Sequence, residues 1–204
     1  MIKGIMIINN HGKVRLARFY NHIDQNKQQR IVREIFTIVS KRSDAVCNFV
    51  EISKSWEERY SSDNKITAVI ESTEETKTDE VQKKMIEERE MKDFFDSKLI
   101  YRHYATLFFI FLVDQSESEL GILDLIQVFV EALDQRFENV CELDIVFHYD
   151  EVNYILDEIV MAGMVLETKL NEIMSAVHGA KKYEKISKKA AKQAKTVLKS
   201  HIVG

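Results

Sequence analysis

The chain has 204 residues, enough for one well-buried domain with an appendage. Its net charge of −4 argues against a nucleic-acid-binding protein. No stretch of it approaches the ~18–20 apolar residues of a membrane span, and its first ten residues lack the cleavage pattern of a signal peptide. We therefore expect a cytosolic protein whose membrane contacts are peripheral.

The first elements predicted along the chain are two strands, at residues 2–8 and 13–20, joined by a hairpin turn at Asn9–Gly12. The spacing of the apolar residues then changes from that of a strand to that of a helix. Apolar residues recur at helical spacing over 25–41, and Asp24 before them is a plausible N-cap.

Three further strands and two helices are predicted after this helix. Residues 46–52 indicate one strand, and the β-branched and aromatic run 99–113 indicates two strands broken near Tyr104. Ser116 and Glu119 have the spacing of a capping box at the start of a helix, and residues 142–162 indicate another helix. Since most strands are adjacent in sequence, we expect an α+β fold, with a five-stranded, mainly antiparallel sheet and helices packed on its faces.

Two strongly charged segments lie outside this pattern. Residues 54–97 contain 13 acidic and 8 basic residues, and we interpret them as a charged insertion between two strands. Residues 180–204 contain eight Lys and one Glu, which predicts a basic tail with strong helix propensity. Contact with anionic lipid and a solvated helix are alternatives for this tail.

Reactive groups are scarce. Cys47 and Cys141 have apolar neighbours and form no C-x-x-C pair, so we expect two buried, reduced thiols. No histidine has a partner at metal-ligand spacing, and no phosphate-binding, zinc-protease or serine-hydrolase motif occurs. We expect no cofactor, no metal and no enzymatic activity.

Three long segments carry a family resemblance: MIKGIMIINNHGKVRLARFY, KLIYRHYATLFF and NVCELDIVFHYDEVNYILDEIVMAG. They resemble the sigma (small) subunits of clathrin-type heterotetrameric adaptor complexes. ELGILDLIQVFVEAL and MVLET look most like the sigma subunit of the third adaptor type, on the endosome-to-lysosome route. The resemblance implies a longin-like domain over 1–172, followed by a basic helical or flexible tail over 173–204. The family has only a short turn where this chain has residues 54–97.

The resemblance also implies a binding site. Sigma subunits, with a large subunit, bind acidic dileucine sorting signals on cytosolic tails of membrane cargo. Arg15 corresponds to the arginine that faces the acidic end, and a planar guanidinium suits a carboxylate. The residues implied to line the leucine pockets are Ala105, Leu107, Val130, Asn139, Val140 and Ile145. From the residues alone, Arg15 would simply be a strand residue that faces solvent, and a role in the core would explain the aliphatic residues equally well.

The implied function is that of a small subunit in vesicle-mediated transport from Golgi or endosome to lysosome or vacuole. Its expected partners are a large adaptin-type subunit, a medium (mu) subunit, a second large subunit and dileucine-bearing cargo tails. Its expected location is the cytoplasm, peripheral on Golgi, endosome and coated-vesicle membranes. A longin-type regulator of membrane fusion and a coatomer zeta-like coat subunit are the alternatives.

Overall fold

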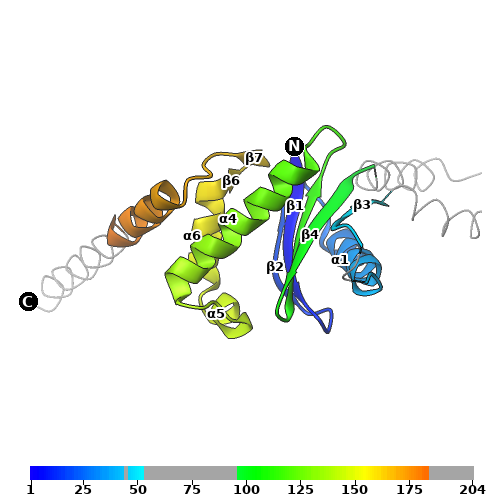
Figure 1. Cartoon of the computed structure of the whole chain (residues 1–204), viewed down its shortest axis with the longest axis horizontal. Coiled ribbons are helices and arrows are strands. Elements are labelled where there is room, and N and C mark those ends of the chain that lie inside the picture. Colours follow the sequence, from blue (N-terminus) through cyan, green and yellow to red (C-terminus); the bar gives the residue numbers. More distant parts are fainter. Residues whose placement is uncertain (44–45, 53–95, 184–204) are drawn as a thin grey trace, which may run out of the picture. The chain divides into compact units, whose positions relative to one another are not determined.

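The computed structural model describes residues 1–43, 46–52 and 96–183, and the chain divides into two compact units, Met1–Ile126 and Gln127–Gly204 (Figure 1). The predicted insertion lies outside the described residues except for Asp96 and Ser97, and the tail beyond residue 183 lies outside them as well. Among the described residues, no helix is both long enough and apolar enough to cross a membrane.

The first unit is built on a five-stranded sheet. Its strands are β1 (Ile2–Asn9), β2 (Val14–Phe19), β3 (Phe49–Glu51), β4 (Lys98–Tyr104) and β5 (Leu107–Val113). They lie in the order β2-β1-β5-β4-β3, and each neighbouring pair is antiparallel. The predicted antiparallel sheet and the break near Tyr104 are therefore confirmed. The third strand is shorter than the predicted 46–52.

The central strands β1 and β5 read as nearly unbroken apolar runs because both of their faces are buried. One face packs against helix α1 (Gln25–Ser40) in a core that includes Met6, Ile8, Ile35 and Ile110. The predicted N-cap of α1 is confirmed, since the Asp24 carboxylate accepts the backbone N–H of Asn26 at 3.0 Å. Figure 1 shows α1 lying along this face, beside β3 and β4.

The predicted capping box at the next helix is wrong. Helix α4 (Glu119–Phe137) begins at Glu119, and Ser118 Oγ accepts the backbone N–H of Gly121 at 3.4 Å. The Ser116 hydroxyl instead donates to Asp114 Oδ1 at 2.6 Å, and the Glu119 carboxylate pairs with Lys98 at 2.8 Å. A nearby carboxylate thus binds Ser116, and a lysine distant in sequence binds Glu119.

The second unit contains the rest of α4, then α5 (Glu142–Phe147), α6 (Tyr149–Ile159) and a small hairpin of β6 (Val160–Met161) with β7 (Met164–Val165). The single helix predicted over 142–162 is therefore wrong: it breaks at His148, whose φ of −115° and ψ of 38° are not helical. A further helix runs over 170–183, and its buried side chains are Ile173, Met174 and Val177.

Both cysteines are exposed and neither forms a disulfide, so the predicted burial of these thiols is wrong. Cys47 lies before the three-residue edge strand β3, and Cys141 is the N-cap of α5. Neither position belongs to a buried face of a regular element. Apolar neighbours in sequence therefore did not decide burial here.

Candidate functional site

The sequence-predicted site residues fall into two groups, one in each unit. Arg15, Ala105 and Leu107 belong to the first unit, and the other four lie in α4, in α5 and in the segment between them. Leu107, Val130 and Ile145 are buried, with 5%, 9% and 0% exposure. Arg15 and Val140 are partly exposed, and Ala105 and Asn139 are exposed.

The three residues of the first unit gather at one end of the sheet, which we call the turn end: the β1–β2 turn (residues 10–13), the β4–β5 turn (residues 105–106) and the strand residues beside them. Leu107 pairs with Asn9 of β1 and with Tyr104 of β4. Ala105 lies in the tight turn with a φ of 52°. Asn10 N–H donates to the carbonyl of Thr106 at 2.9 Å, which joins the two turns.

Arg15 lies at an irregularity in the edge strand β2. Leu16 pairs with Ile7, but Val14 pairs with Ile8, so the register skips Arg15. This is a β-bulge, in which one strand carries an extra residue and a side chain is directed differently from its neighbours. Bulges are over-represented at sheet edges and next to functional sites.

The second group is held by local bonds around the start of α5. Asn139 has a φ of 74°, which asparagine tolerates better than most residues. The N–H of Val140 donates to Asp134 Oδ1 at 2.9 Å, and the N–H of Cys141 donates to Asp144 Oδ2 at 2.9 Å. The backbone N–H of Cys141 is the main cause of a lowered pKa for Asp144.

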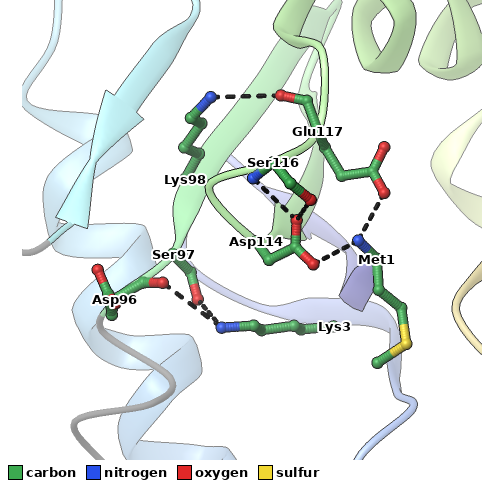
Figure 2. Close-up of polar contacts among 8 residues, drawn as sticks. All are labelled: Met1, Lys3, Asp96, Ser97, Lys98, Asp114, Ser116 and Glu117. Atoms are coloured by element: carbon green, nitrogen blue, oxygen red, sulfur yellow. Dashed lines mark hydrogen bonds and ion pairs between the residues drawn. The ribbon is translucent and has the colours of Figure 1, made fainter.

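The opposite end of the same sheet carries charges, and we call it the ionic end: Met1, Lys98, Asp114, Glu117 and Glu119. The Met1 ammonium donates to Asp114 Oδ2 at 2.6 Å and to Glu117 Oε1 at 2.5 Å (Figure 2). Lys98 Nζ donates to the carbonyl of Glu117 at 3.3 Å. These bonds fasten the start of β1 and of β4 to the segment between β5 and α4.

At the ionic end, the pKa of a carboxyl group is lowered and the pKa of the amino terminus is raised. Hydrogen bonds from the Met1 ammonium, and then from Ser116, lower the pKa of Asp114 to about 2. Partial burial lowers the pKa of the Met1 amine, but hydrogen bonds to Asp114 and Glu117 outweigh it, so the pKa is raised. Each group is more fully charged at neutral pH than it would be alone. The arrangement therefore stabilises structure and offers no poised acid or base.

The sequence analysis did not predict this cluster, and only part of it carries a local sequence signal. Asp114 accepts both the N–H and the hydroxyl of Ser116, a local turn that the D-x-S spacing favours. The contact of Met1 with Asp114 spans 113 positions and leaves no local pattern. Within the described ranges 1–43, 46–52 and 96–183, no group of three or more His, Cys, Asp or Glu residues is arranged to hold a metal ion.

Comparisons with known proteins agree with the fold. Residues 1–58 and 54–184 match the model of the family described as clathrin adaptor complex small chain. The chain belongs to this family. The family consists of structural trafficking proteins, so the chain is a small subunit of an adaptor complex and not an enzyme.

Several relatives are sigma subunits of AP-3 complexes. The chain is 50% identical over 187 residues to the AP-3 complex subunit sigma of Dictyostelium discoideum, covering 91% of this chain and 88% of that one. It is 49% identical over 185 residues to AP-3 complex subunit sigma-2 of Homo sapiens, covering 91% and 77%. It is 40% identical over 197 residues to the sigma subunit of Arabidopsis thaliana, covering 97% and 96%.

A structural likeness agrees with these relatives. The chain matches one chain of a structure described as a homology model of the full-length AP-3 complex in a stretched open conformation, at a TM-score of 0.61 and 33% identity. The match covers 93% of this chain and 99% of that one. The likeness to the third adaptor type is therefore confirmed, and the large and medium subunits of an adaptor complex fit as partners.

Proposed function

We propose that this chain, as the sigma subunit of an AP-3-type complex, helps to recognise acidic dileucine signals on cargo carried toward the lysosome or vacuole. The observation that carries the proposal is the grouping at the turn end. An arginine at a bulge and two residues at the adjoining hairpin lie at one end of a rigid sheet. The complex would act in the cytosol, on Golgi, endosome and coated-vesicle membranes.

The chemistry of the turn end suits one half of such a signal. The Arg15 guanidinium offers a planar fork of donors that a carboxylate can accept in pairs. Its position on a strand limits the movement of its backbone, so little order is lost on binding. The signal's carboxylate lies four positions before its two leucines, so the same peptide must also meet an apolar surface.

The residues predicted to contact the two leucines of the signal include buried side chains. Ile145 is fully buried and Val130 nearly so. A leucine can therefore contact Ile145 only after a neighbouring side chain moves aside. Val140 and Asn139 are more exposed and lie in a segment whose conformation Asp134 and Asp144 stabilise. We infer that leucine binding involves a local rearrangement in the segment 139–147.

The affinity of such a site is modest. A charged hydrogen bond contributes about 1.5–3 kcal/mol, and burial of each leucine about 1.5–3 kcal/mol. Ordering a flexible peptide and losing its free motion removes several kcal/mol. What remains is weaker than about −8 kcal/mol, the value that corresponds to micromolar binding. Simultaneous contacts of the complex with the membrane and with other cargo would raise the effective affinity.

The test uses the assembled complex and a labelled peptide with a glutamate four positions before two leucines. Arg15→Ser is expected to weaken binding by at least about tenfold, because the carboxylate loses its charged donors. The matched control is Arg18→Ser, on the same strand but within the regular register opposite Ile5. Equal binding by the Arg15→Ser and wild-type complexes would remove the proposed role of Arg15 and leave the family assignment intact.

A further inference from the structure

The irregularity in the β1–β2 pair moves Arg15 out of the regular ladder. Since Leu16 pairs with Ile7, an unbroken ladder would pair Arg15 with Ile8. Ile8 is fully buried in the core that packs against α1. Val14, which is 41% exposed, takes the position opposite Ile8 instead. Arg15 therefore falls outside the regular pairing, which changes the direction of its side chain relative to its neighbours on β2.

The β1–β2 turn holds this register. Asn9 is only 5% exposed, and its Oδ1 accepts the N–H of His11 at 3.0 Å and of Lys13 at 2.8 Å. Its own N–H donates to the carbonyl of Lys13 at 3.0 Å, and its carbonyl accepts the N–H of Gly12 at 3.0 Å. Because a hairpin's register follows from the length and bonding of its turn, these bonds fix where β2 begins.

The same turn is tied to the apolar part of the candidate site. Asn9 pairs through its backbone with Leu107, and Asn10 N–H donates to the carbonyl of Thr106. These links use backbone atoms, so replacing the Asn9 side chain leaves them in place. The side chain of Asn9 therefore affects the β2 register selectively, while the position of Leu107 depends on the sheet.

We propose that Asn9 is a positioning residue for acidic-signal recognition: its buried side chain fixes the turn that shifts the register and presents Arg15. This inference rests on the proposed dileucine function and adds a residue that does not itself contact the cargo. It predicts that loss of the Asn9 side chain removes discrimination for the acidic residue and leaves binding to the leucines largely unchanged.

The experiment compares two peptides on the reconstituted adaptor complex, one with glutamate and one with alanine four positions before the two leucines. The wild-type complex is expected to favour the glutamate peptide by about tenfold or more, the range of one charged hydrogen bond. In Asn9→Ala this ratio is expected to fall to about one- to threefold, with the alanine peptide bound as before. Asn9→Ser keeps a hydroxyl acceptor and should restore part of the ratio.

Ile100→Val provides a matched control, because it loosens the buried centre of β4 away from both turns. It should leave the ratio unchanged, which separates positioning from a general loss of stability. A double-mutant cycle adds a second measurement: in an Arg15→Ser background, Asn9→Ser should have no further effect on the ratio. If the Asn9→Ala complexes fail to assemble, this cycle tests the positioning role of Asn9 without them.

The outcomes separate the two proposals. A wild-type complex that binds both peptides equally would overturn the acidic-signal role of Arg15 and this inference with it. A wild-type complex that discriminates, together with Asn9 variants that discriminate equally well, would overturn the positioning role alone. Additive effects of Asn9→Ser and Arg15→Ser in the cycle would do the same.

Discussion

The two ends of the five-stranded sheet are held by different kinds of interaction. At the turn end, neutral hydrogen bonds from Asn9 and backbone groups close the β1–β2 turn. At the ionic end, charged groups of Met1, Asp114 and Glu117 join the strands to the segment that follows. The two ends of the sheet should therefore respond to different changes. The turn end should respond to side-chain volume and backbone conformation, and the ionic end to pH and salt.

The largest effect is expected at the centre of the sheet, which both ends share. Phe109 is 1% exposed in β5, between β1 and β4. Phe109→Ala should lower the free energy of unfolding by about 3–5 kcal/mol, because it removes a large buried side chain and leaves a cavity. Urea unfolding followed by circular dichroism measures this change. Phe147→Ala is the matched control: Phe147 is 75% exposed, and an equal loss there would contradict the assignment of the core.

The next effect is expected at the turn end. Gly12 has a φ of 78°, and a Cβ added there would lie 2.9 Å from the Phe36 ring. Gly12→Ala should destabilise the chain by about 2 kcal/mol through backbone strain and crowding, independently of pH and salt. Gly121→Ala changes the same atoms inside α4, where the nearest side-chain atom is 3.7 Å away. Gly121→Ala should stabilise the chain slightly. A similar loss of stability in both variants would rule out backbone strain and crowding at Gly12 as the cause.

A smaller effect is expected at the ionic end. Asp114→Asn should lower the free energy of unfolding by about 1 kcal/mol at neutral pH, since the carboxylate is about one-third exposed and screened by solvent. Because the pKa of Asp114 falls from 3.8 to about 2 on folding, its contribution is present above pH 3.8 and is lost as the pH falls toward 2. The Met1 amine, whose pKa is raised, loses its contribution as the pH rises above 8.0.

The measurement is the difference in urea midpoint between Asp114→Asn and wild type across this pH range. It should be greatest between about pH 4 and 8 and shrink on both sides. Asp124→Asn, on the exposed side of α4, is the control for the loss of one negative charge. A difference between wild type and Asp114→Asn that stays constant with pH would exclude the ionic mechanism.

The smallest effect is expected for the Lys98–Glu119 pair, in which Glu119 is the more exposed partner. Glu119→Gln should lower the urea midpoint slightly in dilute buffer and by less in about 1 M salt, where the Debye length shrinks to roughly 3 Å. Gly12→Ala, measured in parallel, should be unaffected by salt. A salt response at the turn end would remove the distinction between the two ends.

Much of the fold was predictable from the sequence because its strands are local and strongly patterned. The hairpin at residues 2–20 and the break near Tyr104 follow from apolar periodicity and turn residues. The helix break at His148 did not follow from these patterns. In one continuous helix, Ile145 would share a face with Val152 and Ile155, and all three are buried in the structure. The apolar spacing is therefore compatible with an unbroken helix and does not reveal the break at His148.

The candidate site stays a prediction that rests on family resemblance, and its structural details do not follow from the sequence. Nothing in KVRLARF shows that the register skips Arg15, because the bulge depends on the pairing with β1 and on the turn. The expected capping box failed because the distant Lys98 pairs with Glu119 and the nearby Asp114 binds Ser116.

Hydrogen bonds hold the two chain ends of the predicted charged insertion on the sheet. Ile52, which precedes it, and Ser97, its last residue, are both buried, and the N–H of Ile52 donates to the carbonyl of Ser97 at 3.2 Å. Lys3 of β1 also donates to the Ser97 hydroxyl, at 2.8 Å. These two bonds hold both chain ends of the junction on the sheet, so a fluorescent or affinity tag inserted between them should leave Arg15 and its turn unaltered.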